Sequence, residues 1–266
     1  METKRIKSGD AEIAYWVLGE GAPIVLLHPF PVNHEFWMPV ADSLAARYRV
    51  ILPDLRGHGE SPVGEGTATM EKHGADIVRV MDDANVGRAP LIGLSIGGYV
   101  LFELWRAHRD RVTALGLFNT KAPADTPEAR SARMQAANDV MERGTETFFE
   151  SMIPKVFGKS TREARPDLVE GALRMMRKAS PLGIAQVQRG MAERPDSVGI
   201  LKTMNVPTLI VTGDDDTFAG INEAQLMHQH IPGSQLRVIP KTGHYSAWEQ
   251  PEQALRVLRQ FLDGTN

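Results

Sequence analysis

A serine placed between two glycines is the feature of this sequence best suited to covalent chemistry. The pentapeptide Gly-Leu-Ser-Ile-Gly at residues 93–97 has the pattern G-x-S-x-G, follows an apolar run and precedes a helical pattern at 99–108. A serine on a sharp turn between strand and helix exposes its hydroxyl at a helix N-terminus, where backbone N–H groups favour negative charge. A side chain two positions to either side would collide with the strand and helix. The pattern predicts Ser95 as a nucleophile, although glycines also flank serines in purely structural turns.

His244 is the histidine best placed to activate this serine. A serine hydroxyl is a weak nucleophile and needs a base. His244 follows the last predicted strand and precedes the last predicted helix, and loops at strand ends often hold catalytic groups. Three other histidines fall on helical patterns, and His58 lies in a glycine-bearing loop that favours a hydrogen-bonding role. We therefore predict His244 as the base.

The acid that orients the base is expected between the serine and the histidine in chain order. Three consecutive aspartates at residues 214–216 follow a predicted strand. Three neighbouring carboxylates cannot all serve one imidazole, so we assign Asp216 to the histidine, and Asp214 and Asp215 to the turn. An aspartate-rich turn that only caps the next helix is the alternative. The strand that ends at Phe118 is followed by no carboxylate, which favours the later site.

Backbone amides near two strand ends can stabilise an oxyanion. Ile96 directly follows the nucleophile and supplies one amide, and the sequence His-Pro-Phe-Pro at residues 28–31 supplies another. Pro29 and Pro31 lack an N–H group. We therefore predict the amides of Phe30 and Ile96 as the oxyanion hole, with a purely structural proline-rich turn as the alternative for the loop.

The order of apolar patterns predicts how the chain brings these distant segments together. Short apolar runs typical of buried strands alternate with helical spacing. This alternation predicts an α/β fold whose mostly parallel, doubly wound sheet is covered by helices on both faces. We predict strands at residues 11–18, 24–27, 49–52, 89–92, 112–118, 206–211 and 235–239, and helices at 37–48, 69–85, 99–108 and 246–261.

One long segment interrupts the alternation. Residues 120–195 show helical patterns without a convincing strand, and Thr126 followed by Pro127 is typical of a helix start. We therefore expect a core formed by residues 1–119 and 196–266, with residues 120–195 as a helical insertion. An insertion at this point can fold over the strand ends where open α/β sheets bind ligands.

Composition narrows the class of protein. The chain has 266 residues, of which 42% are hydrophobic and 24% charged, with a net charge of -3. This balance argues against general nucleic-acid binding. The chain contains no cysteine, which excludes disulfides and thiolate metal sites. It shows neither the apolar core of a signal peptide nor a run of about 18 apolar residues. We expect a cytoplasmic protein without membrane contact, and a homo-oligomer is compatible with the sequence.

With these residues in hand, the chain resembles the α/β-hydrolase family along nearly its whole length. The order Ser95, Asp216, His244 matches that family, and residues 28–31 are similar to its His-Gly-x-Pro loop, with Pro29 in place of glycine. Residues 54–61 resemble its D-x-R-G-x-G-x-S loop, and residues 243–251 its G-H-x-x-x-x-E-x-P signature. Within the family, the chain looks closest to small carboxylesterases and to 3-oxoadipate enol-lactonase-like enzymes. The resemblance implies an α/β-hydrolase fold with a helical cap after the sixth strand.

The insertion contributes to the predicted substrate pocket. Residues 120–195 hold half of the 12 methionines, and 13 Lys and Arg against 10 Asp and Glu give the segment a net charge of +3. These methionines fill the core of the cap or form an apolar lid; the charges form a solvated helix face or favour an anionic substrate. The predicted pocket residues are Trp37, Tyr99, Lys121, Met134, Met141, Phe149 and Met152.

The predicted function is a serine hydrolase that cleaves a small carboxylic ester or lactone through an acyl-enzyme, with neither cofactor nor metal. Alternative enzymes are an enol-lactonase acting on an anionic lactone, a cofactor-free haloperoxidase or perhydrolase, and a hydrolase of carbon–carbon bonds. A small-molecule receptor of the same fold is the alternative outside catalysis.

Overall fold

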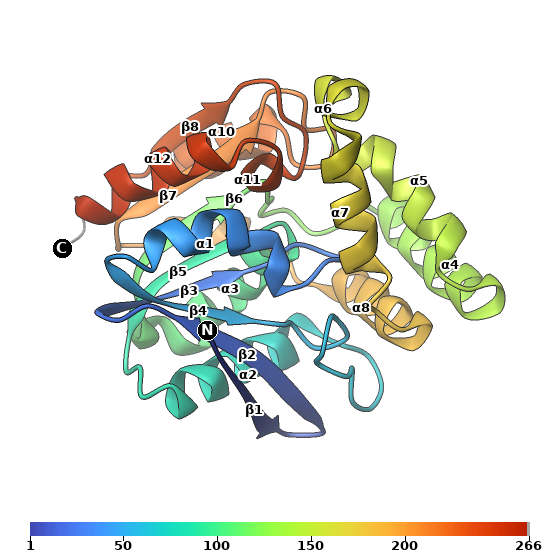
Figure 1. Ribbon diagram of the computed structural model, residues 1–266, viewed down its shortest axis with the longest axis horizontal. Coiled ribbons are helices and arrows are strands. Elements are labelled where there is room, and N and C mark those ends of the chain that lie inside the picture. Colours follow the sequence, from blue (N-terminus) through green and yellow to red (C-terminus); the bar gives the residue numbers. More distant parts are fainter. Residues whose placement is uncertain (265–266) are drawn as a thin grey trace.

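Within residues 1–264, which the computed structural model describes, eight strands form a single sheet between two layers of helices (Figure 1). The strands lie in the order β1-β2-β4-β3-β5-β6-β7-β8. The pairs β1/β2 and β2/β4 are antiparallel, and every later pair in this order is parallel. The strands are β1 (Glu2–Ser8), β2 (Ala11–Leu18), β3 (Ala22–Leu27), β4 (Tyr48–Pro53), β5 (Ala89–Leu94), β6 (Val112–Phe118), β7 (Thr208–Gly213) and β8 (Gln235–Ile239).

The mostly parallel, doubly wound sheet predicted from the apolar runs is confirmed. Three strands have the predicted bounds, and the other four differ by at most two residues at either end. The central strands β3, β5 and β6 are buried on both faces over most of their length. Burial on both faces explains their continuous apolar sequences, because neither face meets water.

Strand β1 was not predicted. It carries charged residues at four of its seven positions, so its sequence lacks the apolar run of a central strand. It lies at the edge of the sheet and pairs with β2 over its whole length, where a solvated face needs little apolar sequence.

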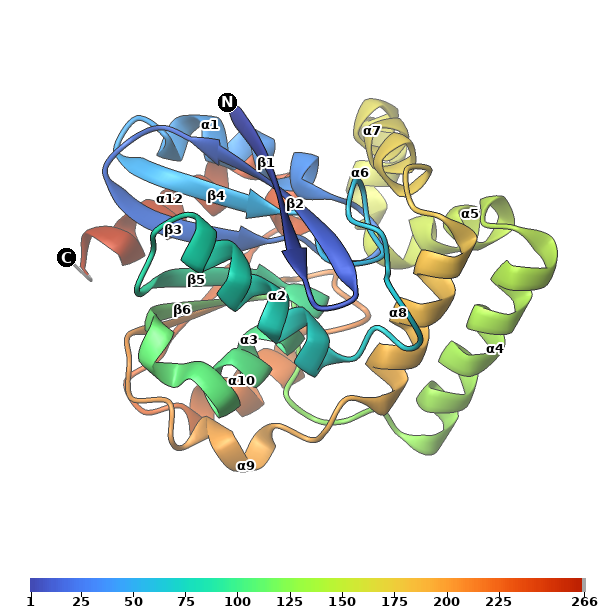
Figure 2. The same cartoon turned by 90° about the horizontal axis from the view of Figure 1, so that it is seen from below.

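Helices cover the two faces of the sheet. Figure 2 shows α1 and α12 on one side, with α2, α3 and α10 on the other. The predicted helix at 69–85 is confirmed as α2, whose buried face includes the expected apolar residues. The elements of these layers are the 3-10 turn η1 (His34–Trp37), α1 (Met38–Leu44), α2 (Met70–Asp83), α3 (Ile96–His108), the 3-10 turn η2 (Arg109–Arg111), α9 (Val198–Leu201), α10 (Ile221–His230), α11 (Ser246–Glu249) and α12 (Pro251–Asp263).

The single helix predicted at residues 246–261 is wrong. The chain forms two helices there, α11 and α12, which are separated at Gln250. Gln250 has φ -134° and ψ 66°, outside the helical region. The cause is Pro251, because a proline ring clashes with a helical conformation of the residue before it.

Between β6 and α9 the chain forms five helices, in the described residues, that lie beyond one end of the sheet in both views (Figures 1 and 2). We call α4–α8 the insertion. Helix α4 begins at Pro127, and the Thr126 side chain caps it by accepting from the Ala129 amide, as the sequence predicts. The helices are α4 (Pro127–Arg143), α5 (Glu146–Val156), α6 (Lys159–Ala164), α7 (Pro166–Met176) and α8 (Pro181–Glu193).

Contacts with the core hold the insertion over the strand ends. The Trp248 indole of α11 donates to the carbonyl of Leu168 in α7 at 3.0 Å. The Glu249 carboxylate accepts from the amides of Gly158, just before α6, and Gly243 at 2.9 and 2.8 Å.

Among residues 1–264, no helix combines the length and apolar character needed to cross a membrane.

Candidate active site

Ser95 stands on a strained turn between β5 and α3. Its backbone has φ 56° and ψ -113°, a positive φ that residues other than glycine rarely adopt. The Ser95 amide donates to the Phe118 carbonyl at 2.9 Å, and the Thr120 hydroxyl donates to the Ser95 carbonyl at 2.8 Å. Two bonds to the end of β6 therefore hold the turn in this conformation.

The glycines at positions 93 and 97 are required because a side chain at either position would collide with the backbone, as the sequence predicts. A Cβ atom on Gly93 would lie 2.4 Å from the carbonyl carbon of Gly97. A Cβ atom on Gly97 would lie 2.6 Å from the carbonyl oxygen of Leu27 in β3. Both distances are far inside van der Waals contact with backbone atoms, so any larger residue would push α3 away from the sheet.

His244 and Asp216 form a buried pair at the ends of β8 and β7. The His244 Nδ1 atom lies 3.1 and 3.0 Å from the two carboxylate oxygens of Asp216. The side chain of Asp216 is fully buried, and that of His244 is 6% exposed. Burial opposes ionisation of Asp216, but the His244 ring, the Asn119 amide and the Phe218 N–H together lower its pKa to about 2. Asp216 is therefore an anion that fixes the imidazole ring.

The other two aspartates, Asp214 and Asp215, hold the loop after β7 to neighbouring segments. Asp214 accepts from the Thr242 amide at 3.2 Å, and Asp215 accepts from the Lys159 amide at 2.8 Å. Asp216 is thus the aspartate of the three that contacts His244.

Asn119 is a member of the site that the sequence did not reveal. It follows β6 with φ 42°, and its side-chain NH₂ group donates to Asp216 at 2.8 Å and to the Gly243 carbonyl at 3.3 Å. Asparagine tolerates a positive φ better than most residues, and the Ser246 hydroxyl donates to its amide oxygen. Asn119 therefore ties the ends of β6 and β7 to the loop before His244.

The His-Pro-Phe-Pro loop after β3 is fastened by its first residue. The His28 Nδ1 atom donates to the Pro29 carbonyl, and Nε2 accepts from the Leu55 amide, both at 2.9 Å. Burial lowers the pKa of His28 to about 3, so the ring is neutral and can accept. The Tyr245 hydroxyl donates to the Phe30 carbonyl at 2.9 Å, and the Phe30–Pro31 peptide is cis. This network orients Phe30 beside the pocket.

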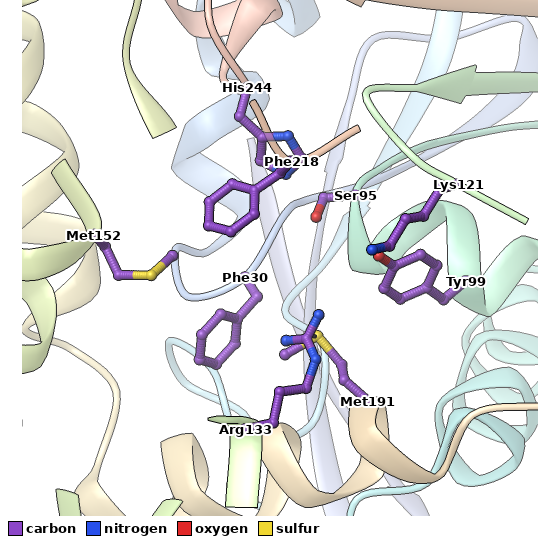
Figure 3. A pocket seen from close by; sticks show the side chains of 9 residues that line it. All are labelled: Phe30, Ser95, Tyr99, Lys121, Arg133, Met152, Met191, Phe218 and His244. Carbon is purple, nitrogen blue, oxygen red and sulfur yellow. Dashed lines mark hydrogen bonds between the residues drawn. The ribbon is translucent and has the colours of Figure 1, made fainter. Parts of the chain in front are cut away.

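A small cavity of about 50 Å³ lies beside Ser95. Figure 3 shows Ser95 and His244 facing it together. Ile96, whose amide was predicted to stabilise an oxyanion, is buried and begins α3 directly after Ser95; helix-start amides have no partner within their helix. Outside the insertion, the cavity is lined by Phe30, Ser95, Tyr99, Lys121, Phe218 and His244. From the insertion, Arg133, Met152 and Met191 reach it.

The predicted pocket set is partly wrong. Tyr99, Lys121 and Met152 line the cavity, but four other residues do not. Trp37 is fully buried in the core between Phe36 and Phe118, and Phe149 is fully buried within the packing of the insertion. Met134 and Met141 are 37% and 49% exposed, because Arg133 occupies the face of α4 that turns toward the cavity.

Three residues that line the cavity were not predicted from the sequence: Arg133, Met191 and Phe218. The sequence offers no pattern that separates Arg133 from the other charges of the insertion, or Met191 from its other methionines. Phe218 lies close to the predicted acid in sequence, and that nearness was the available clue. Its ring stands edge-on to His244, with centroids 5.2 Å apart, and lines the cavity beside the imidazole (Figure 3).

The buried carboxylate of Asp125 lies close to three cationic side chains behind the cavity. Asp125 lies 2.6 Å from Arg133, 2.8 Å from Arg194 and 3.7 Å from Lys121. Burial opposes its ionisation, but the two guanidinium groups hold the pKa of Asp125 below its usual value. Arg194 is itself buried, with its guanidinium carbon 4.2 Å from the centre of the Tyr99 ring. Lys121 and Arg133 remain partly exposed and point into the cavity (Figure 3).

Comparison with known proteins adds the family context. The model of the alpha/beta hydrolase fold family matches residues 22–251. The 3-oxoadipate enol-lactonase 1 of Acinetobacter baylyi is 29% identical over 244 residues, which are 91% of this chain and 90% of that protein.

Two solved structures are closely similar. A thermophilic esterase from Thermogutta terrifontis, described with malate bound, shares 37% identity and superimposes with a TM-score of 0.96 over 100% of this chain and 99% of that one. The enol-lactonase from Burkholderia xenovorans LB400 shares 25% identity, with a TM-score of 0.92 over 98% of this chain and 100% of that one.

Proposed function

The chain belongs to the α/β-hydrolase family, and on this premise we propose that it is a serine hydrolase that cleaves a carboxylic ester or lactone. The observation that carries the proposal is the arrangement at the cavity. A strained serine faces the same small space as a histidine whose far nitrogen is held by a buried carboxylate. This arrangement supplies a nucleophile, a base and an orienting acid. The esterase and enol-lactonase relatives support this class of substrate.

The proposed reaction proceeds through an acyl-enzyme. His244 takes the proton of the Ser95 hydroxyl as its oxygen attacks the carbonyl carbon. The amides of Phe30 and Ile96 donate to the oxyanion of the tetrahedral intermediate. Asp216 keeps the proton on the Nδ1 atom of His244 and stabilises the imidazolium. His244 then donates its proton to the leaving alcohol, and water hydrolyses the acyl group by the same steps in reverse. The insertion acts as the cap that limits water around these groups.

Replacement of the nucleophile tests this proposal. We expect Ser95→Ala to lower kcat/KM for p-nitrophenyl acetate by a factor of about 10⁴ or more, because no other group replaces the attacking oxygen. Ser131→Ala changes an exposed serine on α4 and serves as the control. A folded Ser95→Ala variant that keeps the wild-type rate would overturn the assignment. Wild-type protein that binds esters without turning them over would instead favour a receptor.

The cations at the cavity favour a substrate that carries a carboxylate. Asp125 is shared by three cations, so it leaves Lys121 and Arg133 with uncompensated positive charge where they face the cavity. An anionic group of the substrate would restore the balance in a site partly removed from water. The malate-bound state of the Thermogutta terrifontis esterase is consistent with an anionic ligand in this fold. We therefore propose a monoester of a short dicarboxylic acid, or a lactone with a free carboxylate, as the preferred substrate.

Two esters that differ in charge test this preference. Monomethyl succinate and methyl butyrate have similar size, but the former carries a carboxylate where the latter has a methyl group. We expect Lys121→Met and Arg133→Met each to lower kcat/KM for monomethyl succinate by about tenfold, the range of one charge-assisted hydrogen bond. Methyl butyrate should change by less than about threefold, and the exposed Arg130→Met serves as the control. Equal losses on both esters would contradict a carboxylate subsite.

A further inference from the structure

A second apolar space lies between α4 and α5, outside the cavity beside Ser95. Its volume is about 380 Å³, against about 50 Å³ for the cavity. Small and apolar side chains from both helices line it, together with polar and charged ones. The small and apolar residues of this lining include Ala132, Ala136, Val140, Phe148 and Ser151. We call this space the α4–α5 groove.

Phe148 stands between the groove and the cavity. Its ring lines the groove and also packs edge-on against Phe30, with centroids 6.0 Å apart. Phe30 in turn lines the cavity beside Ser95. Met152 lies one turn after Phe148 on the same face of α5 and lines the cavity. The same helix therefore turns one side chain into each space, with the Phe148 ring at the border.

Helix α4 shows the same division. Arg133 lines the cavity, whereas its neighbour Ala132 and the next-turn residue Ala136 line the groove. The two spaces therefore share walls from both helices.

We infer that Phe148 determines the chain length of the esters that this protein accepts, and that the α4–α5 groove is a binding site for a hydrocarbon chain that the Phe148 ring closes off from Ser95. The inference rests on the proposed ester hydrolysis. With the ring in place, the small cavity accepts short groups. Without the ring, a straight chain of the ester, on its acyl or its alcohol side, can pass Phe30 and enter the groove, where it meets the apolar side chains of α4 and α5.

The expected effect follows from the burial of methylene groups. Each CH₂ group that moves from water into an apolar site contributes about fourfold to binding. Three such groups in the groove would contribute about sixtyfold at full burial, and half of that free energy would still give about eightfold. The groove is partly open at its rim, so we expect the ratio of kcat/KM for octanoate over acetate to rise by about tenfold.

The experiment measures this ratio for a series of p-nitrophenyl esters from acetate to octanoate, and for alkyl acetates of the same chain lengths. Phe148→Ala should raise the long-to-short ratio by about tenfold in one of the two series, which identifies whether the acyl or the alcohol chain enters the groove. Phe148→Leu keeps an apolar side chain in the packing of α5 and should give a smaller rise. Met134→Ala changes an exposed residue of α4 and serves as the control.

A second substitution tests the groove itself. Ala136 faces the groove from α4, so Ala136→Phe in the Phe148→Ala background should fill the groove and return the ratio to the wild-type value. An unchanged ratio in both ester series for folded Phe148→Ala and Phe148→Leu would overturn the inference, as would a raised ratio that Ala136→Phe does not reverse. Ser95→Ala keeps this outcome separate from the proposed mechanism, because a wrong nucleophile would appear there as retained acetate hydrolysis.

Discussion

Replacement of Asp216 by asparagine should largely abolish catalysis, because the ring proton of His244 would move from Nδ1 to Nε2. In the protein, the two carboxylate oxygens of Asp216 accept from His244 Nδ1 at 3.1 and 3.0 Å. One oxygen also accepts from the amides of Phe218 and Ala219 at 2.8 and 3.1 Å, and the other accepts from Asn119 at 2.8 Å. Every group around the carboxylate is thus a donor.

An asparagine at this position has one acceptor and one donor. If its NH₂ group replaces the oxygen that Asn119 contacts, two donors face each other, and the nearer of the two contacts of His244 Nδ1, at 3.0 Å, also becomes a donor. The imidazole then places its proton on Nε2, so it can no longer take the proton of Ser95. A wrong tautomer of this kind lowers the rate by about 10⁴, or about 5.4 kcal/mol of transition-state stabilisation.

Asp214→Asn is the matched comparison. Asp214 accepts a single bond, from the Thr242 amide, which an asparagine oxygen can accept equally well. We expect Asp214→Asn to stay within about threefold of the wild-type kcat/KM for p-nitrophenyl acetate. Both variants are assayed at pH 7 after circular dichroism confirms their fold. Equal losses in the two variants, or an Asp216→Asn variant within tenfold of the wild type, would refute the reasoning about the tautomer.

Two further predictions concern stability. Burial lowers the pKa of His28 to about 3 and that of His58 to about 4, so below the ordinary value near 6.5 the unfolded chain binds protons that the folded protein does not. Their contribution to the free energy of unfolding is therefore intact above pH 6.5 and falls by about 1.4 kcal/mol per pH unit for each histidine between about pH 6 and 4; urea midpoints that stay level from pH 7 to 4 would contradict this. Gly97→Ala forces a Cβ atom against the Leu27 carbonyl and should lower the free energy of unfolding by about 2 kcal/mol, and a Tm equal to the wild type would disprove the contact.

The sequence was most informative where a residue type has one physical use. The glycines around Ser95 predicted a close approach of α3 to the sheet, and the contacts that a Cβ atom would make at Gly93 and Gly97 confirm it. Apolar runs predicted the central strands because burial on both faces leaves no place for polar residues. Position after a strand predicted that His244 and Asp216 would meet, since the carboxyl ends of parallel strands share one edge of the sheet.

The pocket could not be predicted in the same way. On an amphipathic cap helix, residues one position apart point in directions about 100° apart, so the sequence alone cannot decide whether Arg133 or Met134 faces the cavity. Asn119 was missed because its role depends on a carboxylate 97 positions later in the chain. The prediction that Trp37 lines the pocket was wrong because a large aromatic residue near a site fills a core as readily as a pocket.

The most direct test of the account is the position of a covalent adduct. The protein is treated with a fluorophosphonate, which reacts with an activated serine, and the adduct is located by mass spectrometry of its peptides. We predict one adduct, on Ser95, that forms at least a hundredfold more slowly in His244→Ala. Labelling at another residue, or labelling of Ser95 at an undiminished rate without His244, would contradict the proposed nucleophile and base.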